Sequence, residues 1–352
     1  MAASRRRDGK RRAGKIHPLA RLENRFHSWR EQRARARGLT PTVVAFPSYG
    51  SPRWTRVLAR VLILPKQSRR SAQRNQGVRG WRSFMGIPIP YAHVTVTVGE
   101  TTVELVTDRG GVIDAVIEAQ LQPGWQTYSI RTENGEDVTG EVFIVGDDVR
   151  FGVVSDVDDT VLVTALPRKL VAAWNSFVIN EHARLPVPGM AVLLDRILAP
   201  HPGAPMIYLS TGAWSISPML KRFQQRHLFP AGAMLLTDWG PTHDRWFRSG
   251  QEHKRTNLNR LAEEFPDVQW LLIGDDGQHD DEIYTAFASS HPQQVAAVAI
   301  RRLSTAQAVL AGGRTRTRVD DHDASEVPWV SGDDGAGLAA ELEKVGVFGP
   351  RA

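Results

Sequence analysis

Acidic, hydroxyl and amine side chains occur in this chain at the ends of short apolar segments or at the start of a helical pattern that follows one. In chain order they are Asp156, Asp158, Thr160, Ser210, Thr211, Lys254, Asp275 and Asp280. In an open parallel sheet, ligands bind beyond the carboxyl ends of the strands. The order of these residues therefore predicts that they meet at that edge and form one site.

These residue types suit phosphoryl transfer. Carboxylates at neighbouring strand ends repel one another, and a hard cation such as Mg²⁺ relieves the repulsion because it prefers oxygen ligands. With the cation and Lys254 offsetting charge, Asp156 can attack a phosphate dianion as nucleophile. Asp158 can act on the leaving-group side as general acid and then as base. Ser210 and nearby backbone N–H groups can donate hydrogen bonds to the phosphoryl oxygens.

Each of these elements also has an ordinary structural interpretation. The Asp and Thr residues of the D-x-D-x-T segment at 156–160 are types common at turns and helix caps. Ser210 alone fits a helix cap, and Lys254 alone fits a surface lysine. Asp280 alone suits the first turn of a helix, where a negative charge is favourable. All of them together, in this order along the chain, favour catalysis.

Residues 151–302 alternate between strand and helix patterns. Apolar runs of buried-strand type lie at 151–155, 206–209, 233–236, 270–273 and 295–300. Apolar residues at helical spacing lie between some of these runs, as at 216–223 and 258–265. The alternation predicts an α/β fold with a parallel sheet and helices on both of its faces.

Residues 41–150 predict a small antiparallel β-sandwich before this domain. Short segments such as 94–98 alternate apolar and polar residues, and turn residues such as Asn134-Gly135 separate them. No catalytic constellation occurs there. Residues 303–352 predict a mixed-charge tail with a short helical pattern near 338–345. For its acidic cluster at 320–323, a solvated loop is favoured over a cation site.

Composition excludes several classes of protein. The 352 residues include no cysteine, which excludes disulfide scaffolds, thiolate metal sites and cysteine nucleophiles. The longest apolar stretch is shorter than the roughly 18 residues of a membrane span. The first thirty residues are basic but lack the apolar region of a secretory signal. We therefore expect a cytoplasmic protein, peripheral at the inner face of the membrane if it binds lipid.

The net charge of +6 hides an uneven distribution. Residues 1–90 contain 22 Lys and Arg but only 3 Asp and Glu, which leaves 22 basic and 35 acidic residues in the rest of the chain. Residues 1–40 predict a basic arm with an amphipathic helix, since Leu19, Leu22, Phe26 and Trp29 share one face. Such a segment can bind an anionic membrane or, less favoured here, nucleic acid. The alternatives are that its apolar face packs on the next domain or that its charges contact the chain's own acidic part.

The motifs of residues 151–302 resemble those of the haloacid dehalogenase superfamily, and within it the actin patch protein phosphatidate phosphatase family, relatives of the lipins. The resemblance rests on S-D-V-D-D-T at 155–160, Y-L-S-T-G-A-W at 208–214, T-D-W-G-P at 237–241, H-K at 253–254 and I-G-D-D-G-Q-H-D-D-E-I-Y at 273–284. It covers about residues 80–302. It implies a Rossmann-like parallel sheet with a minimal cap, preceded by the small β domain.

The resemblance also implies a role for each site residue. Asp156 is implied as nucleophile and Asp158 as acid and base, with Mg²⁺ as cofactor. Ser210 and Lys254 are implied as phosphate ligands, Thr160 as a support for the loop, Asp275 as a metal ligand, and Asp280 as part of the metal site, directly or through water. We also expect Thr160 and Thr211 to bind the phosphate, and Asp156 and Asp158 to hold the metal. Asp276 departs from the family pattern, in which a small polar residue is expected. Asp159 and Asp281 are expected to cap or to support the site.

Three functions remain open. The first is an Mg²⁺-dependent phosphatidate phosphatase that releases diacylglycerol through an aspartyl-phosphate at Asp156. The second is the same chemistry on a soluble, protein-borne or nucleic-acid phosphomonoester. The third is an inactive lipid-binding module, although intact Asp156 and Asp158 oppose it. Trp214, Trp239 and Trp246 lie near the expected strand ends and can either touch a lipid interface or pack in the core. No feature of the sequence indicates the oligomeric state.

Overall fold

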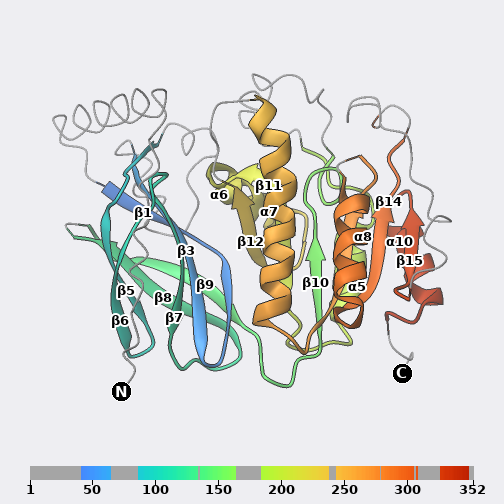
Figure 1. Cartoon of the computed structure of the whole chain (residues 1–352), viewed down its shortest axis with the longest axis horizontal. Coiled ribbons are helices and arrows are strands. Elements are labelled where there is room, and N and C mark those ends of the chain that lie inside the picture. Colours follow the sequence, from blue (N-terminus) through green and yellow to red (C-terminus); the bar gives the residue numbers. More distant parts are fainter. Residues whose placement is uncertain are drawn as a thin grey trace, which may run out of the picture.

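Two β-sheets lie side by side in the computed structural model, a β-rich part formed by strands between residues 41 and 144 and an α/β part formed by the elements from residue 151 on (Figure 1). The structure describes residues 41–64, 86–133, 135–163, 184–237, 243–277, 279–304, 307 and 326–348. Several predictions fall outside these ranges: the arm and helix at 1–40, the tail cluster at 320–323, and Trp239.

In the described residues, nine strands form the first sheet. They are β1 (Pro41–Phe46), β2 (Ser48–Ser51), β3 (Trp54–Ile63), β4 (Ile87–Pro88), β5 (His93–Val98), β6 (Thr101–Val106), β7 (Val112–Glu118), β8 (Gly124–Thr132) and β9 (Val138–Ile144). Their order is β1-β3-β2-β9-β8-β5-β6, with β4 and β7 also paired to β3. Among the described strands, every pairing in this sheet is antiparallel except β2 with β9. An antiparallel sheet is therefore confirmed, with one parallel exception.

The period-two pattern read from the sequence decides which side of these strands is buried. In β5, Val94, Val96 and Val98 are fully buried, whereas Thr95 and Thr97 between them are partly exposed. Thr97 meets Thr102 of β6 across the strand pair, at 3.0 Å between hydroxyl oxygens. Cross-strand pairs of this kind and the apolar inner side stabilise the sheet.

The second sheet has the order β12-β11-β10-β13-β14-β15, and all pairings among these described strands are parallel. Its strands are β10 (Phe151–Ser155), β11 (Met206–Ala213), β12 (Ala233–Thr237), β13 (Gln269–Asp275), β14 (Val295–Arg301) and β15 (Trp329–Gly332). Its helices are α5 (Met190–Leu198), α6 (Ser217–Arg226), α7 (His243–Glu264), α8 (Asp280–Ser290) and α10 (Gly335–Lys344), with the short turns η2 (Trp214–Ile216) and η3 (Pro292–Gln294). The predicted α/β class with a parallel sheet is confirmed.

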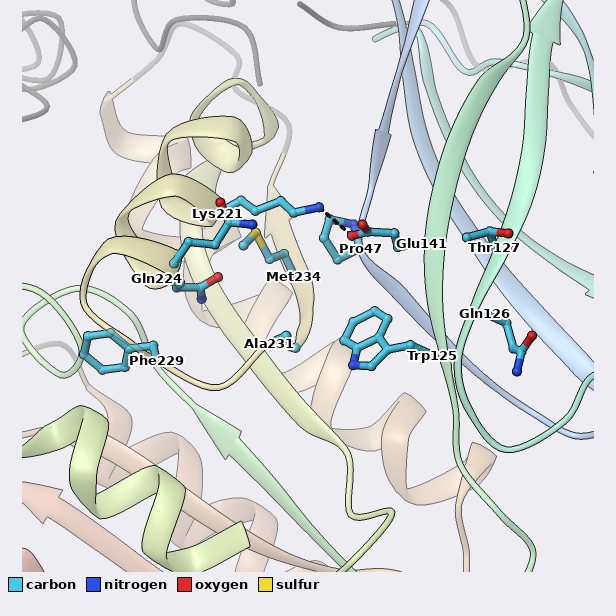
Figure 2. A pocket seen from close by; sticks show the side chains of 12 residues that line it. Pro47, Trp125, Gln126, Thr127, Glu141, Lys221, Gln224, Phe229, Ala231 and Met234 are labelled. Atoms are coloured by element: carbon cyan, nitrogen blue, oxygen red, sulfur yellow. Dashed lines mark hydrogen bonds and ion pairs between the residues drawn. The ribbon is translucent and has the colours of Figure 1, made fainter. Parts of the chain in front are cut away.

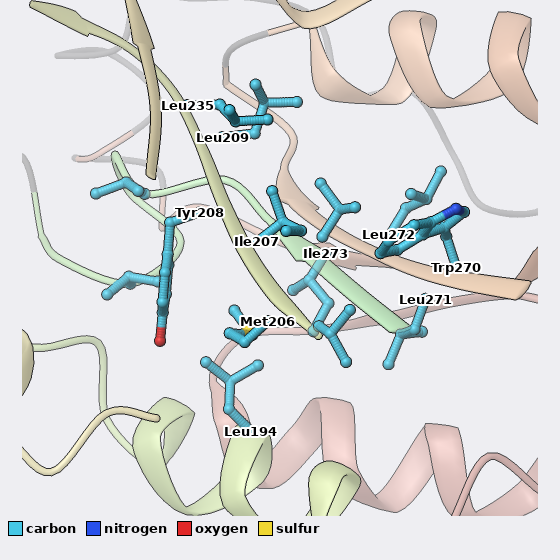
Figure 3. Packing of buried hydrophobic residues seen from close by; sticks show 14 of the residues in the cluster. Leu194, Met206, Ile207, Tyr208, Leu209, Leu235, Trp270, Leu271, Leu272 and Ile273 are labelled. Atoms are coloured by element: carbon cyan, nitrogen blue, oxygen red, sulfur yellow. The ribbon is translucent and has the colours of Figure 1, made fainter. Parts of the chain in front are cut away.

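Buried apolar side chains fill the space between this sheet and its helices (Figure 3). Met206, Ile207 and Leu209 of β11 are at most 4% exposed, and so are Leu271 and Leu272 of β13. Strands buried on both faces have continuous apolar runs rather than alternation, which is why these runs marked the strands in the sequence.

The C-terminal segment adds to the parallel sheet. The sequence predicts a mixed-charge tail from residue 303, and the structure places β15 beside β14, with Val298 opposite Trp329, and α10 after it. The side chain of Asp334 caps α10 by accepting a hydrogen bond from the backbone N–H of Gly337 at 2.9 Å. With only two apolar residues, Trp329 and Val330, this strand has little signal in the sequence.

The two sheets pack against each other through the main apolar cluster, whereas most buried apolar residues of the first sheet form a cluster of their own. Phe46 at the end of β1 stacks on Trp214 with ring centroids 4.6 Å apart, and both belong to the main apolar cluster. The backbone N–H of Met234 donates to the carbonyl of Pro47 at 3.0 Å. Trp214 is therefore a packed core residue, 6% exposed.

A cavity of about 350 Å³ lies between the two parts of the chain at β8, β9 and α6 (Figure 2). Lys221 of α6 forms an ion pair with Glu141 of β9 beside it, and Trp125 and Phe229 line its apolar walls. No residue singled out in the sequence lines this cavity. Within the described part of the chain, no helix combines the length and apolar character needed to cross a membrane.

Candidate active site

The predicted site residues gather where the direction of the sheet's connections reverses. From the central strand β10 the chain continues to β11 on one side, whereas β13 and β14 lie on the other. Asp156 directly follows β10, and Asp275 is the last residue of the adjacent strand β13. A switch point of this kind leaves a crevice at the carboxyl ends of the strands, which is where ligands bind in α/β sheets.

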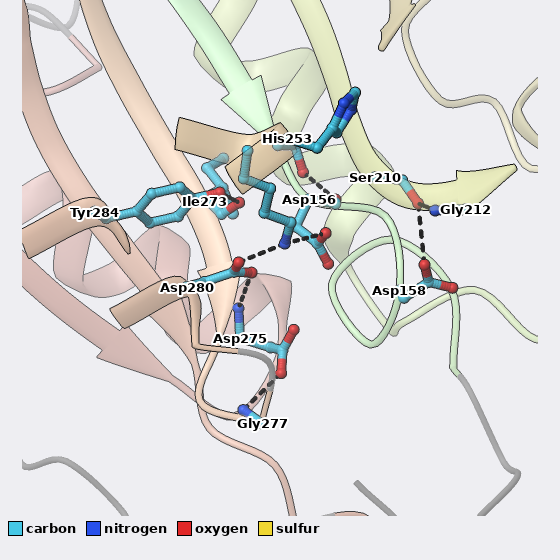
Figure 4. A network of polar contacts seen from close by, with 12 residues as sticks. Asp156, Asp158, Ser210, Gly212, His253, Ile273, Asp275, Gly277, Asp280 and Tyr284 are labelled. Atoms are coloured by element: carbon cyan, nitrogen blue, oxygen red, sulfur yellow. Dashed lines mark hydrogen bonds and ion pairs between the residues drawn. The ribbon is translucent and has the colours of Figure 1, made fainter. Parts of the chain in front are cut away.

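Asp156 is fixed by the sheet and fully buried. Its backbone N–H continues the ladder by donating to the carbonyl of Ile273 at 2.8 Å. Asp158 is 8% exposed, and its Oδ2 accepts a hydrogen bond from Ser210 Oγ at 3.1 Å (Figure 4). Ser210 Oγ in turn accepts from the backbone N–H of Gly212 at 2.9 Å. Ser210 thus lies within β11 and links it to the loop after β10, so it is not a helix cap.

Lys254 is buried rather than a surface lysine. It is 1% exposed, and its Nζ donates to Asp156 Oδ1 at 2.7 Å and also to Asp280 Oδ1. The sequence predicts that Lys254 opens a helix, and this is wrong because α7 begins eleven residues earlier, at His243. The segment 243–253 contains Gly250 and few apolar residues, so no helical period marks it in the sequence.

Three carboxylates lie close together beside this lysine. Oxygen atoms of Asp156, Asp275 and Asp280 all fall within 4.8 Å of one another, and all three residues are buried. Asp156 Oδ2 and Asp275 Oδ2 are buried without a hydrogen-bond partner. Buried carboxylate oxygens that lack a donor are the ligands that a divalent cation prefers, so this group fits Mg²⁺. The carboxylate of Asp158 is not in this group but lies against Ser210.

Burial controls the charges of the site. It raises the pKa values of Asp156, Asp275 and Asp280, and the neighbouring carboxylates raise those of Asp156 and Asp275 further. Lys254 acts in the opposite direction on all three. Burial would lower the pKa of Lys254 itself, but Asp156 and Asp280 outweigh it and hold that pKa above its usual value. The lysine is therefore a fixed positive charge at the site.

Gly274 allows the strand to approach Asp280 closely. A Cβ at this position would lie 2.7 Å from Asp280 Oδ2 and 2.8 Å from the ring of Tyr284. Tyr284 is fully buried, and its hydroxyl donates to the carbonyl of Ile273 at 3.2 Å. A glycine at the end of β13 is thus required to bring the first turn of α8 against the strand.

The remaining predicted residues have varied surroundings. Thr160 is fully buried, and its Oγ1 has no hydrogen-bond partner. Thr211 follows Ser210 in β11, and its carbonyl accepts from Thr237 Oγ1 at 3.0 Å.

Asp276 accepts a hydrogen bond from the backbone N–H of Leu303 at 2.9 Å. Asp276, which departs from the family pattern, therefore connects the loop after β13 to the segment after β14. Asp281 is buried, in the first turn of α8.

Two residues that the sequence did not single out for a role lie beside the site. His253 lines a cavity of about 410 Å³ between the β-rich part and α7, and burial lowers its pKa to about 4, so its imidazole is neutral. Arg301 ends β14 and donates to the carbonyl of Asp159 at 2.6 Å. In the sequence, a buried and hydrogen-bonded arginine at a strand end has the same pattern as an arginine that is exposed to solvent.

Residues 151–302 match the family model for the catalytic domain of phosphatidate phosphatase APP1. This confirms, for these residues, the family resemblance that the motifs indicate. The phosphatidate phosphatase APP1 of Saccharomyces cerevisiae is 26% identical over 151 residues, 43% of this chain and 25% of that protein. An uncharacterized protein of Schizosaccharomyces pombe is 24% identical over 153 residues, 42% of this chain and 24% of that protein. The matched part thus spans about a quarter of the length of these relatives.

Among solved structures, an uncharacterized protein from Listeria monocytogenes is similar to 56% of this chain and 98% of its own chain, with 13% sequence identity and a TM-score of 0.31. A carbohydrate acetylesterase from Xanthomonas citri gives a TM-score of 0.28 over 75% of this chain and 68% of that one, with 8% identity. Scores this low support no argument about fold or function.

Proposed function

We propose that this chain is an Mg²⁺-dependent phosphatidate phosphatase, which hydrolyses phosphatidate to diacylglycerol and phosphate through an aspartyl-phosphate at Asp156. The observation that carries the proposal is the buried group formed by Asp156, Asp275, Asp280 and Lys254 at the switch point of the sheet. The family match over residues 151–302 supports the substrate. We extend the proposal to a haloacid dehalogenase-like fold with a minimal cap, since the same motifs carry that resemblance.

Asp156 is the proposed nucleophile because its Oδ2 lacks a hydrogen-bond donor, while Lys254 holds Oδ1. A carboxylate oriented in this way can attack phosphorus in line with the leaving alkoxide, so that the O–P bond to Asp156 forms as the bond to diacylglycerol breaks. Fixed donors reduce the entropy cost of reaching this geometry.

Asp158 is the proposed proton donor to the leaving oxygen, and then the base that deprotonates the water that attacks the aspartyl-phosphate. Its contact with Ser210 Oγ keeps its carboxylate on the β11 side of the site, away from the three-carboxylate group. The proposed phosphate ligands are Ser210, Thr211, Thr160 and Lys254. Of these, Lys254 contributes most because it supplies a full charge in a dry site.

Asp156, Asp275 and Asp280 are the residues that would hold the cation, whereas Asp158, also expected from the sequence as a ligand, has its carboxylate against Ser210. When bound, Mg²⁺ would neutralise part of the carboxylate charge and draw electron density from the phosphoryl oxygens. The unpartnered Oδ2 of Asp275 supports this assignment, since the free Oδ2 of Asp156 is the proposed attacking atom.

We propose that residues 1–40 bring the enzyme to an anionic membrane surface, at the cytoplasmic face. Basic residues and one apolar helix face are the features of interfacial helices. Removal of residues 1–40 is expected to weaken hydrolysis of phosphatidate in vesicles but to spare a small chromogenic phosphomonoester. An equal loss on both substrates would contradict the anchor and make the segment structural.

The proposed function is tested by phosphate release from phosphatidate in mixed detergent micelles, with Mg²⁺ and then with excess chelator. Release that depends on Mg²⁺ supports the proposal. Hydrolysis of a small phosphomonoester without release from phosphatidate would instead support the second candidate, the same chemistry on another phosphate ester. If neither substrate is hydrolysed, the inactive lipid-binding module is favoured, and sedimentation with vesicles then tests lipid binding.

A further inference from the structure

We propose that Arg301 is a positioning residue for this reaction: it fixes the loop after β10 and ties it to the C-terminal unit β15–α10. The inference rests on the proposed function for its catalytic consequence, but its structural part stands on the contacts of Arg301 alone.

Asp159 is the residue whose conformation requires such a restraint. Its φ of 59° lies in the left-handed region, which residues other than glycine rarely adopt. A conformation of this kind persists only where the surrounding structure over-determines it. Both sides of the Asp159 backbone are held, since its N–H donates to the carbonyl of Leu162 at 2.8 Å and its carbonyl accepts from Arg301 Nη1 at 2.6 Å.

Arg301 reaches three separate segments from one buried position. It is 5% exposed, and besides the Asp159 carbonyl its guanidinium donates to the Asp333 carbonyl at 3.1 Å and to Gln307 Oε1 at 3.1 Å. Its own backbone carbonyl accepts from the N–H of Asp276 at 3.1 Å, next to Asp275. The planar fork of an arginine makes such divergent bonds at once, and a lysine ammonium on a flexible stem does not reproduce them.

The C-terminal unit supplies the far anchor. Asp333 lies between β15 and α10, and Gly332 of β15 is opposite Arg301 in the parallel ladder. The start of α10 is in turn held against the turn before α5, where the N–H of Gly335 donates to the carbonyl of Pro188 at 2.9 Å. This unit lies beyond residue 302, where the family match ends. The clamp therefore joins the candidate active site to a part of the chain outside the matched domain.

Loss of the clamp acts on Asp158, because the peptide that Arg301 holds begins one residue later. Release of the Asp159 carbonyl lets the loop move and shifts Asp158 relative to Ser210. A displacement of about 1 Å in a catalytic group can cost about 10²-fold in rate. Of the proposed phosphate ligands, Thr211 and Lys254 lie outside this loop, and Lys254 keeps its contacts with Asp156 and Asp280, so the effect falls on kcat more than on KM.

The test compares Arg301→Lys and Arg301→Gln with the matched control Arg302→Gln. Arg302 is the next residue, but its side chain is exposed and forms a surface ion pair with Asp333 Oδ1, at 3.0 Å. Hydrogen exchange of amides 156–162 is measured in the folded proteins, together with kcat, KM and the pH profile of kcat. The expected result is faster exchange in both Arg301 variants, a kcat lowered about 10- to 100-fold, a shifted pH profile, and KM within about threefold. Arg302→Gln is expected to match the unsubstituted protein.

Unchanged exchange in a folded Arg301→Lys protein would overturn the clamp, and so would an equal effect of Arg302→Gln. Faster exchange with unchanged kcat would overturn its catalytic consequence. If the unsubstituted protein hydrolyses neither phosphatidate nor a small phosphomonoester, the proposed function fails, while the exchange measurement still decides whether Arg301 fixes the loop.

Discussion

Lys254 Nζ lies 2.7 Å from Asp156 Oδ1 in a part of the protein where both side chains are at most 1% exposed. The same ammonium also donates a hydrogen bond to Asp280. Asp275 is the third carboxylate of the group, and its Oδ1 accepts from the backbone N–H of Gly277 instead of from the lysine. One buried positive charge thus faces three buried carboxylates. This imbalance is the physical reason to expect a divalent cation at the site.

The cation should stabilise the protein more at high pH than at low pH. Burial raises the pKa values of Asp156, Asp275 and Asp280 above those of the unfolded chain, so in cation-free protein the free energy of unfolding falls as pH rises above about 4. A cation that binds the ionised carboxylates reverses this loss, by about 2.7 kcal/mol at a hundredfold excess over its Kd. Thermal unfolding with Mg²⁺ or chelator, at pH 5 and pH 8, measures it. Equal shifts at both pH values would contradict the carboxylate site.

Asp275→Asn should remove this response while making the cation-free protein more stable at pH 8. The substitution deletes one buried charge, yet the side-chain oxygen that accepts from Gly277 at 2.6 Å can remain. The matched control is Asp276→Asn, since Asp276 is only partly buried and its role is to accept from the Leu303 N–H. The control should keep the Mg²⁺ shift. If both variants retain it, Asp275 is not a ligand.

Lys254→Met should destabilise the cation-free protein at pH 8 by about 3–5 kcal/mol, because it leaves two buried carboxylates without their partner. The loss should shrink toward pH 5, since protonation of the raised-pKa carboxyls removes the uncompensated charge. Lys221→Met breaks a partly exposed pair and should cost at most about 1 kcal/mol. Chemical denaturation at the two pH values measures both, and a loss in Lys254→Met that does not depend on pH would argue against buried charge as its cause.

Gly274→Ala should destabilise the protein by about 1–3 kcal/mol, the range for an overpacked core, and should abolish the Mg²⁺ shift. The new methyl group would meet Asp280 and Tyr284 at less than van der Waals distance and push the first turn of α8 from β13. Gly337→Ala in α10 is the matched control, since its nearest neighbour would lie 3.5 Å away and alanine favours the helix. Thermal unfolding compares them, and a cation response that survives in Gly274→Ala would show that Asp280 need not be so close.

Sequence periodicity predicts the parallel sheet and the edge at which the site forms, because fully buried strands leave continuous apolar runs. It places Asp156 and Asp275 at strand ends, where the structure has them, but it ends the strand at 206–209 before Ser210, whereas β11 continues to Ala213. It misses the first half of α7, whose polar residues and Gly250 carry no apolar period, and it misses β15, which has only two apolar residues.

Roles that depend on long-range contacts are not encoded in local patterns. Arg301 and Asp159 are 142 residues apart, and their hydrogen bond depends on the pairing of β14 with β13 and β15 rather than on any motif. The burial of Lys254 likewise follows from how α7 packs against the sheet. In the sequence, a buried lysine that pairs with two carboxylates has the same pattern as a lysine exposed to solvent.

Asp156→Asn tests the central claim most directly, because asparagine keeps the size of the side chain but cannot form an aspartyl-phosphate. With phosphatidate in mixed micelles and Mg²⁺ present, phosphate release should fall at least about 10³-fold. Acid-quenched Asp158→Asn protein, in which hydrolysis of the intermediate is slowed, should carry a phosphoryl group on Asp156 by peptide mass spectrometry. Release by Asp156→Asn within about tenfold of an active unsubstituted protein would contradict Asp156 as the nucleophile.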